Sequence, residues 1–245
     1  LMGPTATEKT DTAIRLTEQF PADIISVDSA MVYRGMDIGT AKPSQQELAK
    51  APHRLIDICD PSESYSAGQF CEDAKRHIDD IHDRGRTPLL VGGTMLYFWR
   101  LQQGIANLPN ANSALREELL LEAKELGWPI MHEKLKTVDS QAAARIHPND
   151  SQRIQRALEV YYETGKPLSE WQSEQGDKDH NYRFINLAIA PKDRTELHQR
   201  IAERFDKMLQ DGLIEEVQAL YDRDDIHPDL PSMRMVGYRQ VWQYL

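Results

Sequence analysis

The segment from Gly3 to Thr10 constrains the fold of this chain more than any other feature. It reads Gly-Pro-Thr-Ala-Thr-Glu-Lys-Thr and is followed by a helical pattern that runs to about Phe20. Phosphate-binding loops follow the pattern G-x-x-x-x-G-K-[ST], in which backbone N–H groups and a lysine contact the phosphates and a hydroxyl contacts Mg²⁺. The segment departs from this pattern only at its sixth position. It therefore predicts a strand, a phosphate-binding loop and a helix in succession.

Glu8 occupies that sixth position, where the pattern has glycine. Glycine gives the backbone freedom and leaves room beside the anion. A carboxylate about 6 Å from one phosphate charge would repel it by about 3 kcal/mol at an effective dielectric constant near 20, which is a hundredfold in affinity. The sequence leaves three alternatives open. Either the Glu8 side chain points outward, or the loop binds phosphates poorly, or the residue is an engineered or misread position.

The first hundred residues alternate between strand and helix patterns. We expect strands at residues 24–27, 54–58 and 88–91. A capping-box sequence, Ser66-Ala67-Gly68-Gln69, predicts the start of a helix that ends near Arg84. Strands that alternate with helices in this way are typical of a parallel sheet covered by helices on both faces.

The pattern changes near Asn107. From Ser113 to about Gly165 only helical periodicity is found, and the polar stretch 173–181 is a candidate linker. Another strand is expected at 184–190, followed by a long helix from about Asp193 to Gln210 and two further helical segments. The simplest architecture is a P-loop NTPase-like α/β core at 1–106, an α-helical insertion domain at 107–180 and a return to the core, apparently incomplete, at 181–245.

Charge and cysteine content narrow the class of protein. There are 39 Asp and Glu residues against 29 Lys and Arg, for a net charge of -10. This balance argues against a nonspecific nucleic-acid coat or a binder of anionic membranes, but it allows a local basic site. The two cysteines form no Cys-x-x-Cys motif, and no apolar run approaches the ~20 residues of a membrane span. We therefore expect a reduced, cytoplasmic enzyme.

Three further segments carry a resemblance to a known family. The first is Ser26–Pro43 with His53–Asp57, the second is Val91–Tyr97, and the third is Ile146–Val160 with the later Val236–Arg239. Together with the loop, in this order and spacing, the chain resembles the bacterial tRNA dimethylallyltransferases, also called tRNA isopentenylpyrophosphate transferases. The resemblance covers essentially the whole chain. It implies transfer of a dimethylallyl group from dimethylallyl diphosphate to N6 of adenosine 37 in tRNA, with release of pyrophosphate, by a monomeric enzyme.

The resemblance also implies the roles of residues around the reaction. Asp28 would be the general base that contacts the adenine N6, and Thr94 would lie beside the reacting groups. Lys9 and Arg204 would stabilise the leaving pyrophosphate, with Arg200 a weaker choice and Mg²⁺ held by Thr10. The loop would bind the prenyl diphosphate instead of ATP. The expected diphosphate-binding residues are Gly3, Pro4, Thr5, Ala6, Thr7, Glu8, Lys9, Thr10 and Arg204.

A second set of residues matches stretches that contact tRNA in relatives. The members are Asp28, Ser29, Ala30, Met31, Gln152, Arg153, Ile154, Gln155, Arg156, Arg234, Met235, Val236, Gly237, Tyr238 and Arg239. Their arginines would contact phosphates and stack on bases, which reconciles RNA binding with an acidic chain. The target base must leave its stack, at a cost of a few kcal/mol.

Other interpretations remain open. Asp28 and Thr94 are each in a position typical of a helix N-cap, and Arg153 and Arg156 are in positions typical of solvated or ion-paired side chains. A small-molecule or nucleotide kinase is possible on the same fold, as is a prenyltransferase for free adenine nucleotides. Glu8 also suggests a third possibility, an RNA-binding protein without catalytic activity.

Overall fold

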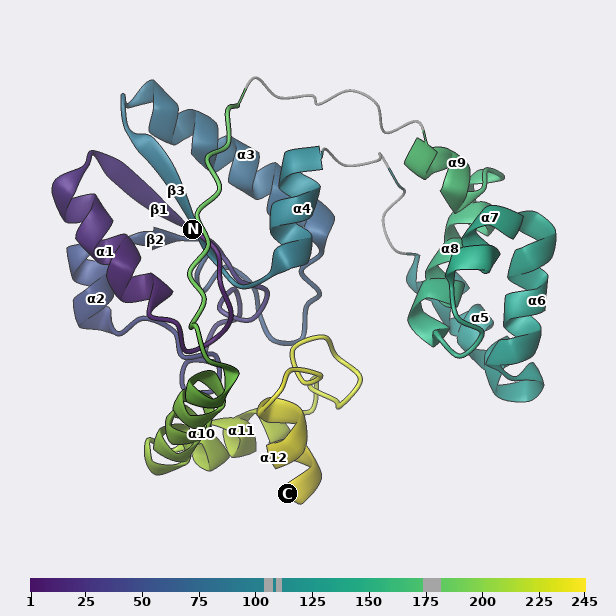
Figure 1. The fold of residues 1–245 in the computed structure, drawn as a ribbon. Coiled ribbons are helices and arrows are strands. Elements are labelled where there is room, and N and C mark those ends of the chain that lie inside the picture. Colours follow the sequence, from purple (N-terminus) through teal and green to yellow (C-terminus); the bar gives the residue numbers. More distant parts are fainter. Residues whose placement is uncertain (104–107, 109–111, 174–181) are drawn as a thin grey trace. The chain divides into compact units, whose positions relative to one another are not determined.

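The structure, a computed structural model, describes residues 1–245 except 104–107, 109–111 and 174–181 (Figure 1). The chain forms two compact units, one from Leu1–Gln102 with Arg183–Leu245 and the other from Gln103–Tyr182. The expected domain boundaries at 106/107 and 180/181 fall on residues outside this description.

A parallel three-stranded sheet lies at the centre of the first unit. Its strands β1 (Ala22–Val27), β2 (His53–Arg54) and β3 (Thr87–Gly92) are arranged in the order β2-β1-β3. β1 and β3 pair along their whole length, with Val27 opposite Gly92. Both strands therefore end at the same edge of the sheet, and the residues that follow them meet there.

Three predicted strands differ from the structure. The strand expected before Gly3 is not formed, since Met2 makes only isolated bridges, to Gly92 and Ala188. The strand expected at 54–58 is wrong beyond Arg54, because Leu55 (φ 63°) and Asp57 (φ 57°) have left-handed backbones that end the extended chain. The strand expected at 184–190 is also wrong, since only Ala188 forms a bridge, to Met2. The apolar side chains of Ile185 and Leu187 are exposed, so this run of apolar residues does not reflect burial in a sheet.

Helices cover both faces of the sheet, as predicted (Figure 1). The four helices of the first hundred residues are α1 (Lys9–Gln19), α2 (Gln45–Lys50), α3 (Ala67–Asp83) and α4 (Met95–Gln103). The predicted capping box of α3 is confirmed, with Ser66 and Gln69 each accepting a hydrogen bond from the backbone of the other. On the α1 side, Ala13 and Ile14 pack against Ile24 and Val91 in a buried cluster.

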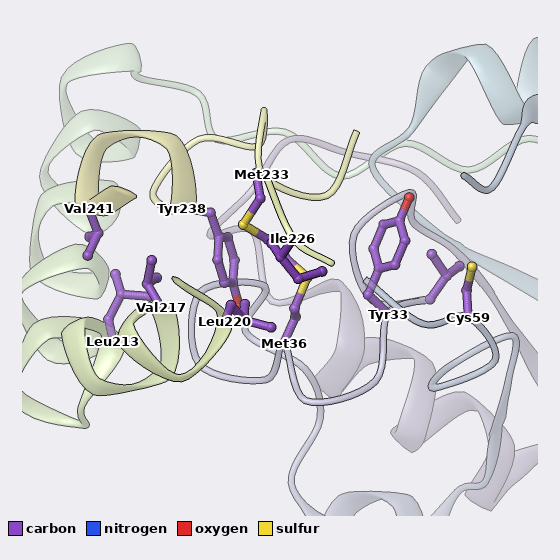
Figure 2. Close-up of a cluster of buried hydrophobic side chains, with 11 residues drawn as sticks. Tyr33, Met36, Cys59, Leu213, Val217, Leu220, Ile226, Met233, Tyr238 and Val241 are labelled. Carbon is purple, nitrogen blue, oxygen red and sulfur yellow. The ribbon is translucent and has the colours of Figure 1, made fainter. Parts of the chain in front are cut away.

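The segment Arg183–Leu245 completes the first unit with three helices. They are α10 (Arg194–Gln210), α11 (Leu213–Tyr221) and α12 (Tyr238–Tyr244). Figure 2 shows how side chains from α11, α12 and the segment between them meet the loop that follows β1. This C-terminal cluster consists of Val32, Tyr33, Met36, Cys59, Leu213, Val217, Leu220, Ile226, Met233, Tyr238 and Val241. It fixes the C-terminal helices to the loop at the carboxyl edge of the sheet.

The second unit is helical, which confirms the periodicity found between Ser113 and Gly165. Its helices are α5 (Ser113–Leu126), α6 (Trp128–Val138), α7 (Ser140–Arg145), α8 (Ser151–Thr164) and α9 (Leu168–Ser173). They enclose a core of their own, in which Met131, Leu135, Ile154 and Leu158 are fully buried. In neither unit does a described helix combine the length and the apolar composition that crossing a membrane requires.

Candidate active site

A cavity of about 1070 Å³ opens at the carboxyl edge of the sheet, within the first unit. Five segments form most of its wall: the phosphate loop with the start of α1 (4–11), the residues after β1 (28–31), the end of β3 with Thr94 (91–94), the loop 39–43 and one face of α10 (200–208). Ligands of open α/β sheets bind at this edge. Most of the predicted catalytic and diphosphate-binding residues line this one cavity.

The predicted phosphate loop has the conformation that its sequence requires. Lys9 is the first residue of α1, and its Nζ donates a hydrogen bond to the carbonyl oxygen of Pro4. Thr7 Oγ1 also donates to the Pro4 carbonyl, at 2.8 Å. Gly3 passes so close to Ile189 that an added Cβ would lie 2.2 Å from the Ile189 carbonyl oxygen. Only glycine fits at that position.

Glu8 has a left-handed backbone (φ 55°, ψ 33°), which explains why the pattern has glycine there. Its side chain is 70% exposed, and its Oε1 lies 3.3 Å from Nη1 of Arg200 on α10. Arg200 also pairs with Glu196, at 2.7 Å. Of the three alternatives that the sequence left open, the structure supports an outward, ion-paired Glu8.

Asp28 and Thr94 meet where β1 and β3 end. Asp28 Oδ1 accepts hydrogen bonds from the backbone N–H groups of Ala30 (2.8 Å) and Met31 (3.3 Å). Thr94 Oγ1 accepts from the N–H of Ser29, at 3.0 Å. The helix N-cap interpretation of Asp28 is wrong, because a turn and no helix follows it. The two turn hydrogen bonds occupy one carboxylate oxygen, and no described residue donates a hydrogen bond to the other.

Three of the charged residues that line the cavity, Lys9, Asp28 and Arg204, lie close enough to influence one another. Burial lowers the pKa of Lys9, the nearby Arg204 lowers it further, and Asp28 opposes both effects. Burial also lowers the pKa of Arg204, again opposed by Asp28. Two partly desolvated cations therefore lie within electrostatic range of one carboxylate, beside a helix N-terminus. This arrangement attracts an anionic group and leaves a carboxylate next to it.

Thr10 lines the same cavity as the second residue of α1. Among the described residues, no three His, Cys, Asp or Glu side chains are arranged to hold a metal ion. Mg²⁺ commonly keeps several waters and binds through substrate phosphates and few protein oxygens. The residues present therefore fit a Mg²⁺ ion shared with a bound phosphate group, and they do not form a complete protein-only site.

The tRNA-contact residues predicted in the first unit differ in how accessible they are. Ser29, Ala30, Met31, Val236 and Gly237 line the cavity. Arg234 and Arg239 are exposed, and Arg234 lies 3.5 Å from Asp229. Met235 is partly buried against the C-terminal cluster.

Tyr238 differs from its predicted role. Its side chain is fully buried, and its hydroxyl donates a hydrogen bond to Glu216 at 2.5 Å. Burial, reinforced by this carboxylate, raises the pKa of Tyr238 well above its usual range. The structure gives this side chain a packing role, because an RNA could not reach it.

The predicted tRNA-contact residues on α8 also include both exposed and buried side chains. Gln152 and Arg153 are exposed, and Arg153 pairs with Asp150 at 2.7 Å. Ile154 is fully buried in the helical core, so a direct contact with RNA does not apply to it. Gln155 donates a hydrogen bond to the carbonyl oxygen of Arg116, at 3.1 Å. Arg156 lies 3.1 Å from the carboxylate of Glu159.

Glu159 is a residue that the sequence reasoning missed. It is fully buried and pairs with both Arg116 and Arg156, each at 3.1 Å. It also accepts a hydrogen bond from the backbone N–H of Asn112, at 2.9 Å. The spacing of three residues between Arg156 and Glu159 was the one local signal for this cluster.

Lys42 and Glu216 were also missed. Lys42 has a side chain only 4% exposed, paired at 2.5 Å with Asp37 and Asp57. Glu216 accepts hydrogen bonds from the backbone of residues 37–39, which precede it by more than 170 positions. No local sequence pattern indicates contacts over such separations.

The fold and the cavity define a P-loop α/β enzyme with a cavity that attracts anionic groups and with a helical insertion. The family model described as IPP transferase matches residues 31–245. This chain belongs to that family. Over all its 245 residues it is 59% identical to a protein of Coxiella burnetii (strain Dugway 5J108-111) named tRNA dimethylallyltransferase, of which it covers 79%.

Solved structures give the same result. The crystal structure of the tRNA isopentenylpyrophosphate transferase from Bacillus halodurans is 41% identical, with a TM-score of 0.65 over 99% of this chain and 75% of that one. A eukaryotic dimethylallyltransferase acting on tRNA is 27% identical, with a TM-score of 0.80 over 99% of this chain and 61% of that one. The predicted family and the P-loop NTPase-like fold are confirmed.

Proposed function

We propose that this protein transfers a dimethylallyl group from dimethylallyl diphosphate to N6 of adenosine 37 in tRNA and releases pyrophosphate. One observation carries the proposal. A single cavity brings together the phosphate loop, the cations Lys9 and Arg204, and the Asp28 carboxylate, one oxygen of which accepts no hydrogen bond from a described residue. The names of relatives that match the whole chain support the prenyl donor and the tRNA acceptor.

The proposed reaction assigns one role to each side of the cavity. The bond between the allylic carbon and the diphosphate oxygen breaks, and its electron pair leaves with the pyrophosphate. Lys9, Arg204 and the N–H groups of the loop stabilise the charge that develops there. The N6 nitrogen forms the new bond to carbon, and its proton passes to Asp28. Thr94 lies beside the reacting groups and holds the Ser29 backbone in place.

A divalent metal is a further part of the proposal. The Thr10 hydroxyl, at the start of α1, would be the protein ligand of Mg²⁺, and the substrate diphosphate would supply most of the rest. When bound, Mg²⁺ would neutralise part of the charge on the leaving group.

For tRNA binding we propose the accessible members of the predicted set. On the first unit these are Asp28, Ser29, Ala30, Met31, Arg234, Met235, Val236 and Arg239, and on the second Gln152, Arg153, Gln155 and Arg156. Gly237 is buried, but it lines the cavity. The buried Ile154 and Tyr238 support these surfaces from within. Since the acceptor would be tRNA, we place the protein in the cytoplasm.

The test is a transfer assay. The protein is incubated with dimethylallyl diphosphate, Mg²⁺ and a tRNA anticodon stem-loop that contains adenosine 37, and the RNA fragments are analysed by mass spectrometry. We expect a gain of one C5H8 unit at adenosine 37 and none when guanosine replaces it. Unmodified RNA would contradict the proposal. Prenylation of free AMP, or formation of ADP from ATP with a small acceptor, would instead support one of the alternatives left open by the sequence.

A further inference from the structure

Glu216 on α11 binds the backbone of a distant loop. Its Oε2 accepts hydrogen bonds from the N–H groups of Asp37 and Ile38, both at 2.8 Å, and its Oε1 accepts from the N–H of Gly39 at 3.1 Å. Successive backbone N–H groups form a concavity that binds anions. Here the anion is a side-chain carboxylate of the protein itself, and the hydrogen bonds are charge-assisted.

The contact between Glu216 and the loop is closely packed. Tyr238 donates its hydroxyl to Glu216 Oε1, and its ring lies against Gly39. A Cβ added at Gly39 would lie 2.5 Å from that ring and 2.9 Å from Leu213. Tyr238 and Leu213 both belong to the buried C-terminal cluster shown in Figure 2. The loop is therefore bound to a rigid part of the fold.

The loop continues directly into the wall of the active-site cavity. Residues 39–43 line this cavity, and Arg204 on α10 lines it too. A smaller cavity of about 590 Å³ is lined by Ala41 and Lys42 of the loop together with Arg204 and Met208 of α10. The loop and the Arg204 side of α10 thus share both cavities, and the position of one limits the space available to the other.

We propose that Glu216 is a positioning residue for the diphosphate side of the site. By holding the N–H groups of residues 37–39, it sets the distance between the 39–43 wall and the face of α10 that carries Arg204. In this proposal Glu216 touches neither substrate. That the bound diphosphate is dimethylallyl diphosphate is taken from the proposed function. We expect that loosening the loop weakens diphosphate binding and leaves the chemical step nearly intact.

The test compares Glu216→Gln with the wild type in steady-state transfer and in a calorimetric titration with pyrophosphate. Glutamine is isosteric, but it loses the charge and presents an NH2 donor to backbone donors. We expect KM for dimethylallyl diphosphate and Kd for pyrophosphate to rise about tenfold, because part of the binding free energy would then be used to order the loosened loop, with kcat changed less than about threefold. Glu215→Gln is the matched control, because Glu215 is its exposed neighbour, and it should behave like the wild type.

Gly39→Ala provides an independent test, since its Cβ would push the loop away from Tyr238 while Glu216 stays intact. It should also raise KM and Kd, and it decides the question if Glu216→Gln does not fold. Unchanged KM and Kd in folded Glu216→Gln would overturn the proposal. So would a lower kcat at unchanged KM, which is the result expected of a merely structural residue that reduces the folded fraction. If the wild type transfers no prenyl group, the proposed function fails, while the pyrophosphate titration still tests Glu216.

Discussion

Glu8 and Arg200 form an ion pair, at 3.3 Å, between the phosphate loop and α10. The carboxylate at the glycine position of the motif is thereby turned toward a cation. We expect Glu8→Gly to change KM for dimethylallyl diphosphate by less than about twofold, because an exposed and paired charge has little effect on a neighbouring anion. Arg200→Ala, which leaves Glu8 unpaired, should raise KM about two- to fivefold.

The double variant separates two explanations of that rise. If Arg200 acts by neutralising Glu8, KM should return to the wild-type value when Glu8→Gly is combined with Arg200→Ala. If Arg200 binds the diphosphate directly, the double variant should keep the raised KM. Steady-state KM for dimethylallyl diphosphate in the four proteins of this cycle is the measurement.

Asp28→Asn tests whether the carboxylate does more than stabilise the turn that follows β1. The asparagine oxygen can still accept the hydrogen bonds from Ala30 and Met31, so the free energy of unfolding should change by less than about 1 kcal/mol. The amide cannot take the N6 proton, and kcat should fall about a hundredfold or more. Single-turnover transfer rates combined with urea unfolding give both quantities. Wild-type kcat in this variant would leave Asp28 with the role of stabilising the turn alone.

Because the pKa of Lys9 is lowered, we expect the affinity for diphosphate to fall at alkaline pH. Burial, together with Arg204, lowers its pKa below the ordinary value of 10.5. Only the ammonium form attracts phosphate, so affinity is present below the folded-state pKa and is lost as pH rises through it. Pyrophosphate Kd, measured by titration from neutral pH upward, should therefore increase before pH 10.5 is reached. In Lys9→Arg, whose side chain remains charged, the increase should disappear; if it persists, another group is responsible.

Substitution of Arg153 should affect tRNA binding and not stability, whereas substitution of its neighbour Ile154 should affect stability. Arg153 is 75% exposed and its ion pair is at the surface, so Arg153→Ala should leave stability nearly unchanged. If Arg153 contacts a tRNA phosphate, the variant should weaken tRNA binding and reduce the slope of log K against log salt by about one. Ile154→Ala should destabilise the protein by about 2–5 kcal/mol. An unchanged salt slope in Arg153→Ala would remove Arg153 from the proposed RNA-binding surface.

Local signals in the sequence were sufficient for much of the fold. The loop that ends at the start of α1 and the capping box at Ser66 depend on residues within eight positions of one another, and both were predicted correctly. The strand expected at 54–58 was wrong because an apolar run does not reveal the left-handed backbones of Leu55 and Asp57. In the site, the roles assigned to Asp28 and Arg204 stay predictions, although both residues line the expected cavity.

Features that depend on long-range contacts or on the direction of a side chain could not be predicted from the sequence. The family resemblance identified the stretches around Ile154 and Tyr238 but not which of their side chains point inward. Helical spacing from Ile154 to Ala157 and Leu158 was an available sign of a buried face. Glu216 gave no sign, because its partners lie in a loop that precedes it by more than 170 residues.

The close approach of Gly3 to the Ile189 carbonyl has a consequence for biosynthesis. Met2 exchanges backbone hydrogen bonds with Leu187 and Ile189, both at 2.8 Å, so the phosphate loop rests on a segment made after the whole helical unit. A ribosome that has released only the first hundred residues has not yet supplied that support. The helical unit has its own core, and all its residues are synthesised before the segment that supports the phosphate loop. We therefore expect the phosphate loop to reach its final conformation late in synthesis, after most of the chain has emerged.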